Sequence, residues 1–426
     1  MKTKAVRLYG KMDLRLEEFE LPEIKDDEIL ACVISDSICM SSYKAASQGA
    51  GHKRVPNDVA ENPVIIGHEF CGKLVKVGAK WADQFKEGDK FVIQPALNYK
   101  GSLAAPGYSY QYIGGDATYV ILPHEVMELG CLLPYDGDAY FYGSLTEPMS
   151  CIVGGFHANY HTTAGSYVHK MECKERGNMA ILAGAGPMGL GCADYAIHGG
   201  NPPSLLIITD IDDARLARAA QLTTVEDAAA HGVKLLYVNT NNIENPVEYL
   251  RELTGGAGYD DVFVYAPVKP VVEMGDALLA HDGCLNFFAG PTNPEFSAMF
   301  NFYNVHYGAT HIVGTSGGNT DDMKESIKLM SEGKINPAGM ITHIGGLDSV
   351  AETTLNLPHI KGGKKLVYTH INLPMTAIED FGKAAEEYKG TELGDLFADL
   401  DVICKEAGGL WCAKAEERIL KLAADL

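Results

Sequence analysis

A short glycine-rich stretch in the middle of the chain constrains the fold more than any other feature. Residues 179–183 form an apolar run of strand length, followed by the pattern Gly184-x-Gly186-x-x-Gly189 and by residues 190–197, which can form a helix. This order of strand, glycine turn and helix is the context that a dinucleotide-binding fingerprint requires. The sequence therefore predicts a nucleotide-binding strand–turn–helix unit.

Each glycine of the fingerprint has its own task. Gly184 permits a tight turn, Gly186 lets the main chain approach a pyrophosphate, and Gly189 allows the helix to pack closely on the strand. The phosphate then lies at the helix N-terminus, where free N–H groups and the helix dipole favour an anion. We therefore expect the turn, with Pro187 and Met188 at the start of its helix, to bind the cofactor.

A carboxylate follows at the distance that this fold requires. The next apolar run, residues 205–209, ends in Asp210, about 20 residues beyond the last glycine, where an acid bonds a ribose 2′-hydroxyl and repels a 2′-phosphate. The sequence therefore favours NAD over NADP. Arg215 and Arg218 follow, and they leave NADP open if Asp210 turns away.

Composition excludes several classes of function. The net charge of −21 argues against nucleic acid or an anionic membrane as the main partner. No apolar run approaches the roughly 20 residues that span a bilayer, and the N-terminus lacks the apolar core of a signal peptide. The ten cysteines form no CxxC pair, so we expect reduced thiols and a cytoplasmic location.

Three short segments ahead of the fingerprint carry side chains of the type that bind metals. They contain Cys39, the pair His68 and Glu69, and Glu147. A thiolate, an imidazole and a carboxylate make a catalytic zinc set that leaves one position open. His124, which also precedes a glutamate, is an alternative to His68.

A metallohydrolase is a weaker interpretation of the same residues. Gly72 stands four residues after His68, so the second histidine of an HExxH zinc site is missing. A non-catalytic nucleotide sensor, in which any zinc is structural, is a third possibility.

Taken in order, Cys39, the Gly67-His68-Glu69 triplet, the Glu147-Pro148 pair and the glycine fingerprint resemble the zinc-dependent medium-chain alcohol and polyol dehydrogenases. The resemblance covers roughly residues 1–370. Within that family it is closest to the branch of sorbitol dehydrogenases and bacterial sugar-phosphate reductases. It favours His68 over His124.

The resemblance implies an α/β architecture in which a GroES-like β-rich catalytic domain, made from both ends of the chain, receives an inserted Rossmann domain with a doubly wound parallel sheet. We expect the catalytic domain at residues 1–160, the Rossmann domain at 161–317, and a return to the catalytic domain with a helical C-terminal extension at 318–426.

Roles for individual residues also follow from the resemblance. Cys39, His68 and Glu147 match the zinc ligands, and Glu69 matches a carboxylate that enters and leaves the coordination shell in some members. Ser41 matches the hydroxyl that relays the proton of the substrate alcohol. Lys44 stands where some relatives have a relay histidine, and we expect it to be solvated.

The sequence departs from the family in three places. Met40 and Ser42 stand where the family has glycine and aspartate, so the usual carboxylate partner of the metal histidine is missing and Asp36 is a substitute to test. Residues 94–115 lack the cysteines of the family's structural zinc, which predicts one catalytic zinc and no structural zinc. Residues 372–426 exceed the usual length, and a helical cap or subunit contact is expected there.

The predicted reaction is hydride transfer between NAD(H) and a sugar phosphate or polyol. Lys53 and Arg54 place two cations in the loop between Cys39 and His68, and such side chains suit a phosphate. A non-phosphorylated polyol or a threonine-type substrate is the alternative. We expect a small-molecule substrate, no nucleic acid or membrane partner, and a homo-oligomer, either a dimer or a tetramer.

Overall fold

The computed structural model describes residues 1–423 and divides into two compact units. The first unit contains Met1–Glu147, Asn319–Ile327 and the C-terminal part from Pro337, and the second contains Pro148–Gly318 and Lys328–Asn336. Both ends of the described chain therefore belong to the first unit.

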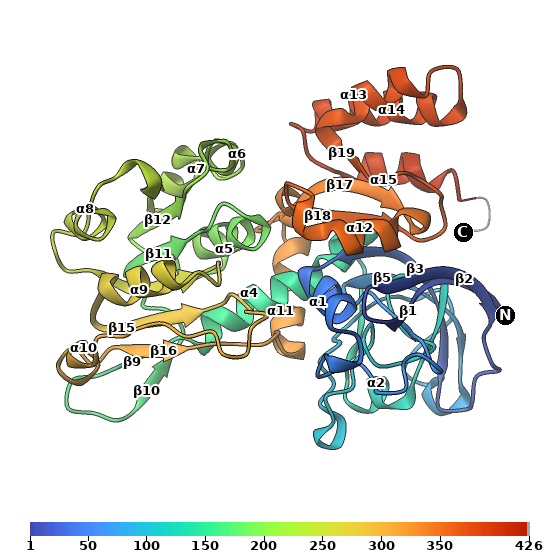
Figure 1. The fold of residues 1–426 in the computed structure, drawn as a ribbon, viewed down its shortest axis with the longest axis horizontal. Helices are drawn as coiled ribbons and strands as arrows, with labels where there is room; N and C mark the ends of the chain where they lie inside the picture. The colour runs from blue at the N-terminus through green and yellow to red at the C-terminus, as the bar shows by residue number, and fades with distance from the viewer. Residues whose placement is uncertain (424–426) are drawn as a thin grey trace. The chain divides into compact units, whose positions relative to one another are not determined.

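The second unit is built on a sheet of six parallel strands in the order β13-β12-β11-β14-β15-β16. Its strands are β11 (Asn178–Leu182), β12 (Leu205–Asp210), β13 (Lys234–Asn239), β14 (Tyr259–Val264), β15 (Leu279–Phe287) and β16 (His311–Val313). The chain runs outward from β11 through β12 to β13 and then returns to β14 on the other side of β11. Figure 1 shows β12, β11, β15 and β16 in this order across the sheet. This reversal is where doubly wound sheets bind their ligands, and it confirms the predicted fold of this part.

Helices join these strands as the alternating pattern predicts. The helices are α5 (Pro187–His198), α6 (Asp213–Leu222), α7 (Val225–Ala230), α8 (Pro246–Glu252), α9 (Lys269–Leu278) and α10 (Phe302–Tyr307). A hairpin of β9 (Tyr160–Thr162) and β10 (His169–Met171) forms a separate small sheet ahead of β11. The sequence pattern did not predict α7, α8 or this hairpin, because segments this short show no clear periodicity.

The first unit contains an eight-stranded mixed sheet and a three-stranded antiparallel sheet. The strands are β1 (Lys2–Gly10), β2 (Asp13–Glu20), β3 (Ile29–Ile38), β4 (Val64–Ile65), β5 (Phe70–Val77), β6 (Lys90–Ile93), β7 (Tyr119–Leu122), β8 (Leu132–Pro134), β17 (Ile341–Gly346), β18 (Lys364–Tyr368) and β19 (Thr376–Ala377). β18 pairs with β3 in an antiparallel register that sets Lys365 opposite Ile38. The C-terminal strands thus complete the sheet begun by the N-terminal ones, as the family resemblance implied.

Short helices complete the first unit. They are α1 (Met40–Gln48), α2 (His124–Glu128), α3 (Tyr140–Ser144), α12 (Val350–Asn356), α13 (Phe381–Glu387), α14 (Glu392–Glu406) and α15 (Ala413–Leu420). Two further helices, α4 (Thr146–Ala158) and α11 (Thr320–Ser331), begin in the first unit and end in the second.

The C-terminal extension is part of the core of the first unit. Phe397, Leu400, Trp411 and Ile419 are buried in one cluster with Tyr368 of β18. The tail is helical, as predicted, and its last helix ends at Leu420. Residues 424–426 lie outside the described residues. Packing of this kind stabilises the sheet that carries the site.

Two general properties follow from the described residues. No helix within residues 1–423 is long and apolar enough to cross a membrane. All ten cysteines are free thiols.

Candidate active site

Cys39 lies at the junction between a buried strand and a helix. All ten residues of β3 are buried, and the strand ends at Ile38, so that Cys39 becomes the N-cap of α1. Ser41, in the first turn of α1, donates a hydrogen bond from Oγ to the Cys39 sulfur at 3.0 Å. Burial, together with the Glu69 carboxylate, raises the pKa of the Cys39 thiol to about 12.

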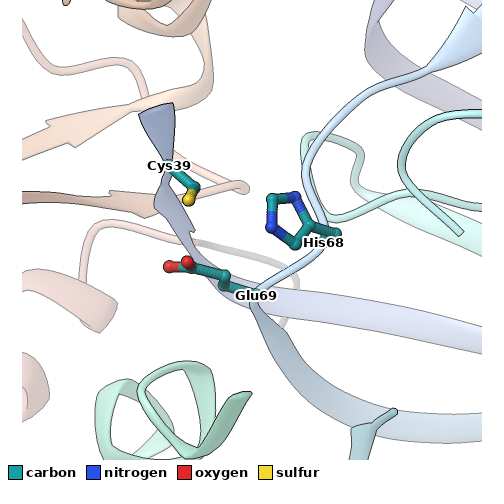
Figure 2. A group of neighbouring side chains, drawn as sticks. All are labelled: Cys39, His68 and Glu69. Atoms are coloured by element: carbon teal, nitrogen blue, oxygen red, sulfur yellow. The ribbon is translucent and has the colours of Figure 1, made fainter. Parts of the chain in front are cut away.

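His68 and Glu69 lie in the turn between β4 and β5, and Gly67 makes this turn possible. Gly67 has a φ of +88°, and a Cβ there would lie 2.7 Å from the main-chain nitrogen of Asp116. Only glycine fits this conformation and this close approach. The tight turn directs the buried side chains of His68 and Glu69 toward Cys39 (Figure 2).

Cys39, His68 and Glu69 form a group that fits a zinc ion. Each offers one ligand atom, and these atoms lie within 4.8 Å of one another. Sulfur, imidazole nitrogen and carboxylate oxygen are the ligands that zinc prefers. Burial lowers the pKa of His68 to about 4, so the ring is neutral at pH 7, as a metal ligand must be.

Glu69 is fixed by a buried counterion. Lys364, from β18, contacts both carboxylate oxygens, and its Nζ lies 2.6 Å from Oε1. Ser37 donates a short hydrogen bond to the same carboxylate. Burial would lower the pKa of Lys364, but the neighbouring Glu69 raises it above its ordinary value, which keeps the ion pair charged.

Glu147 lies close to this group without belonging to it. It is a buried residue in the first turn of α4. Burial raises the pKa of Tyr108, and the charge of Glu147 adds to this rise. Burial lowers the pKa of Lys364, whereas Glu69 and, to a smaller extent, Glu147 raise it. Among the described residues 1–423, the metal-type group at this site consists of Cys39, His68 and Glu69 and does not include Glu147.

The carboxylates behind the turn have a different role from the one expected. Asp36 accepts a hydrogen bond from the main-chain N–H of Glu69 at 3.1 Å. The Nδ1 atom of His68 is buried and has no hydrogen-bond partner among the described residues. Asp36 therefore supports the main chain of the turn and does not replace the missing partner of His68. Burial raises the pKa of Asp116, beside Asp36, to about 7.

Ser41 and Tyr108 both point to the same nitrogen of His68. Each hydroxyl lies 3.2 Å from His68 Nε2. Ser41 is the predicted proton relay. Tyr108 lies in a long loop without regular structure, and no sequence signal marks it as a neighbour of His68.

A cluster of basic side chains adjoins Tyr108. The guanidinium carbon of Arg54 lies 5.3 Å from the centroid of the Tyr108 ring, and the Arg54 Nε atom is buried without a hydrogen-bond partner. His52 stacks on the same ring at 5.8 Å. Burial, followed by the charges of Arg54, Lys53 and Lys44, lowers the pKa of His52.

The basic residues differ in exposure. Lys53 is exposed and Arg54 is half-buried. Lys44 is also half-buried, contrary to the solvated position expected, and burial lowers its pKa. Of the two predicted substrate cations, Arg54 is therefore the one that contacts Tyr108, the ring next to His68. His124 starts α2, where its Nδ1 atom lies 3.1 Å from Glu125, and it is absent from the ligand group.

The fingerprint in the second unit has the geometry expected of a phosphate turn. Gly186 is the N-cap of α5 and Pro187 follows it. A Cβ on Gly189 would lie 2.1 Å from the main-chain oxygen of Gly184, whereas a Cβ on Gly186 would meet nothing within 4 Å. Glycine is thus required at residue 189 for close packing, while residue 186 leaves open space at the helix N-terminus, which Met188 also adjoins.

Asp210 stands at the end of β12, next to the turn. One carboxylate oxygen accepts the N–H groups of Ile211 at 2.8 Å and Asp212 at 3.2 Å. The other accepts the N–H of Ala185, inside the fingerprint, at 3.3 Å. The carboxylate is therefore held beside the glycine turn.

Comparison with known proteins gives consistent results. Residues 25–131 match the alcohol dehydrogenase GroES-like domain, and residues 187–332 match the zinc-binding dehydrogenase family. A mannitol-1-phosphate 5-dehydrogenase of Aliivibrio fischeri is 53% identical over 419 residues, which are 98% of this chain and 97% of the relative. An L-sorbose 1-phosphate reductase of Klebsiella pneumoniae is 48% identical over 424 residues, which are 100% of this chain and 98% of the relative.

A solved structure supports the fold. The 2R,3R-butanediol dehydrogenase of Bacillus subtilis superposes with a TM-score of 0.69 at 21% identity, covering 86% of this chain and 99% of its own. The predicted combination of a GroES-like domain with a Rossmann domain is confirmed.

Proposed function

The chain belongs to the zinc-dependent medium-chain dehydrogenases, and on this premise we propose that it interconverts a phosphorylated ketose and the corresponding polyol phosphate with NAD(H). It is an oxidoreductase that acts on CH–OH groups with zinc and NAD(P), as the resemblance implied. Two relatives that share about half of its residues are named for sugar-phosphate substrates, which supports a substrate of that class.

The proposed zinc ligands are Cys39 and His68, and either Glu147 or Glu69 would be the third. When bound, zinc polarises the substrate oxygen and stabilises negative charge that develops on it, and the nicotinamide carries the hydride. Because Lys364 already neutralises Glu69, Glu147 is the better candidate for a permanent ligand. Glu69 would coordinate only after leaving Lys364.

Ser41 has the position of a proton carrier. Its hydroxyl lies between the sulfur of Cys39 and Nε2 of His68, at 3.0 Å and 3.2 Å. A hydroxyl there can accept the proton of a substrate alcohol and pass it on, so that bulk water need not enter. The hydroxyl of Tyr108 lies 3.2 Å from the same nitrogen of His68.

The position of Arg54 is the observation that supports a phosphorylated substrate. Its guanidinium lies over the Tyr108 ring, and that ring lies 4.8 Å from the ring of His68. A buried nitrogen donor without a partner is costly unless a ligand satisfies it, and guanidinium groups bind phosphate oxygens in pairs. Lys44 and Lys53 add positive charge to a chain that is otherwise strongly acidic.

We further propose a cytoplasmic homo-oligomer. The free cysteines suit a reducing compartment. Phe302, Tyr303 and Tyr307 of α10 are strongly exposed, and exposed apolar clusters are typical of subunit contacts. Light scattering of the purified enzyme would give the subunit number, and a monomer would contradict this part of the proposal.

The decisive experiment compares phosphorylated and unphosphorylated ketoses, with NADH and NADPH side by side, while the zinc content is measured. We expect turnover of a ketose phosphate with NADH, and loss of turnover together with zinc in Cys39→Ala. Faster turnover of the free ketose would favour the alternative polyol dehydrogenase. Full activity in zinc-free enzyme would reject the proposed site.

A further inference from the structure

A second group of metal-type side chains lies in the nucleotide-binding unit. His198 is the last residue of α5, Asp227 lies in α7, and His231 directly follows α7. Each offers one ligand atom, and these atoms lie within 4.8 Å of one another. We propose that His198, Asp227 and His231 bind a divalent transition-metal ion of the zinc type.

The donor set and its spacing suit such an ion. Two imidazoles and a carboxylate are an established zinc set that leaves the fourth position to water. His198 Nε2 lies 3.0 Å from Asp227 Oδ2, and His231 Nδ1 lies 3.9 Å from Asp227 Oδ1. Two ligands of a tetrahedral zinc are about 3.3 Å apart, given metal–ligand bonds of about 2.0–2.1 Å. His231 Nδ1 also lies 3.0 Å from the main-chain oxygen of Asp227 and donates to it. Coordination through Nδ1 would break this hydrogen bond, and rotation of the exposed His231 side chain would then bring the three donors to that geometry.

His198 has the supporting partner that metal-binding histidines require. Its Nδ1 lies 2.7 Å from Oδ1 of Asp194 and 3.0 Å from the main-chain oxygen of the same residue. Because both atoms are acceptors, Nδ1 carries a proton and donates it, and Nε2 is the nitrogen that faces Asp227. The other oxygen of Asp194 accepts the N–H of Asn336 at 2.7 Å. This carboxylate–histidine arrangement orients ligands in metal sites.

The surroundings favour a cation and give it access. His198 ends α5, and His231 caps α7, so that carbonyl groups of two helix C-termini face the group. The carboxylates of Asp194 and Asp227 add negative charge. The side chain of His198 is 14% exposed, whereas Asp227 and His231 are 47% and 44% exposed. The site thus has one fixed ligand beneath two that solvent reaches.

A bound ion would connect the helix of the glycine turn to the segment that precedes β13. Without an ion, the same contacts form a hydrogen-bonded cluster that joins α5 to α7. The two alternatives differ in how many zinc ions each chain retains, and that number can be measured without an activity assay.

The test loads the full-length enzyme with zinc, removes unbound metal on a desalting column and measures zinc per chain by mass spectrometry. We expect two ions in the wild type, and one in both His231→Ala and Asp227→Asn. His281→Ala is the matched control, since His281 is an exposed histidine of the same unit, and it should retain two. Circular dichroism checks that each variant is folded.

The outcome is independent of the proposed catalytic zinc. The Cys39→Ala variant should lose the catalytic zinc and retain the ion at His198. The double variant Cys39→Ala, His231→Ala should lose both ions. Equal zinc content in the wild type, His231→Ala and Asp227→Asn would overturn the second site, whatever the result for Cys39→Ala. Conversely, unchanged zinc in Cys39→Ala would reject the catalytic site alone.

Discussion

Lys364 Nζ lies 2.6 Å from Oε1 of Glu69, although 295 positions separate the two residues in the chain. The two side chains are only 5% and 2% exposed. β18 brings Lys364 to this place by pairing with β3, which ends beside Cys39. The C-terminal part of the chain thus supplies the charge that holds a residue of the candidate site.

Removal of Lys364 should destabilise the enzyme strongly. In Lys364→Ala the carboxylate of Glu69 remains buried without a counterion, a change that costs about 3–5 kcal/mol. We expect this loss in the free energy of unfolding by urea denaturation. Lys364→Arg keeps the charge and should recover much of the stability. A loss below about 1 kcal/mol in Lys364→Ala would show that the ion pair is not important for folding.

Replacing Arg54 and replacing Lys53 should have different effects on substrate binding, although the sequence predicts the same phosphate-binding role for both residues. Arg54 is half-buried over Tyr108, and Lys53 is exposed. Loss of a hydrogen bond to a charged group costs about 1.5–3 kcal/mol, so Arg54→Ala should raise KM for the sugar phosphate roughly 10- to 100-fold with little change in kcat. Lys53→Ala should change KM by less than about threefold, as a screened surface charge does.

The unphosphorylated sugar is the control for this comparison. Its KM should be similar in the wild type and Arg54→Ala, because the guanidinium then has no phosphate to bind. If Arg54→Ala weakens both sugars equally, Arg54 supports the shape of the site through Tyr108 and does not bind phosphate.

Much of the fold follows from short-range patterns, and the reasons are visible in particular elements. The helix predicted after the glycine turn is found at residues 187–198 because Pro187 and Gly199 limit it at both ends. The apolar runs at 179–183 and 205–209 correspond to the buried strands at 178–182 and 205–210. The short strand β16, which is only partly buried, was not predicted. The hairpin at 160–171 and the position of α7 depend on tertiary contacts, which the hydrophobic periodicity of a short segment does not predict.

The candidate site was predictable only where the family pattern marks it. Cys39, His68 and Glu147 were expected as ligands, with Glu69 as a carboxylate that enters and leaves the shell. The ligand atoms of Cys39, His68 and Glu69 lie close together, and Glu147 is outside this group. Lys364 and the contact of Tyr108 with His68 were missed because these side chains reach the site from a distant strand and a long loop, without a motif of their own. The second histidine group was missed for the same reason, since His198 and His231 come together only when α5 and α7 pack.

Glu416 should be essential for anchoring the C-terminal extension. This buried residue of α15 accepts the main-chain N–H groups of Tyr140 and Phe141 at 2.6 and 2.8 Å, and the hydroxyl of Tyr368 at 2.8 Å. An amide cannot accept all three, so Glu416→Gln should lower the free energy of unfolding by about 1–3 kcal/mol. The neighbouring Glu417 is exposed, and Glu417→Gln should leave the stability unchanged in the same denaturation assay. Equal effects would argue against this anchor.

Asp210 should set the preference for the cofactor. Its carboxylate lies beside the glycine turn through Ala185, where it would meet a 2′-phosphate and repel it. We expect Asp210→Ser to lower kcat/KM with NADH and to raise it with NADPH, changing their ratio at least tenfold. An unchanged ratio in a folded variant would show that other residues, such as Arg215, decide the preference.

The stability of the enzyme should decrease in mild acid, and His343 should contribute to the decrease. Burial, followed by the charge of Lys365, lowers the pKa of His343 to about 4, whereas a histidine in an unfolded chain titrates near 6.5. Between these values the unfolded state binds a proton that the folded state does not, so the free energy of unfolding falls as the pH falls from about 6.5 to 4. In His343→Gln this part of the decrease is absent, and the difference in stability between variant and wild type should shrink or reverse toward pH 4. His281→Gln, at an exposed position, should follow the wild type across the same urea series. A constant difference between His343→Gln and the wild type at every pH would mean that His343 titrates alike in both states.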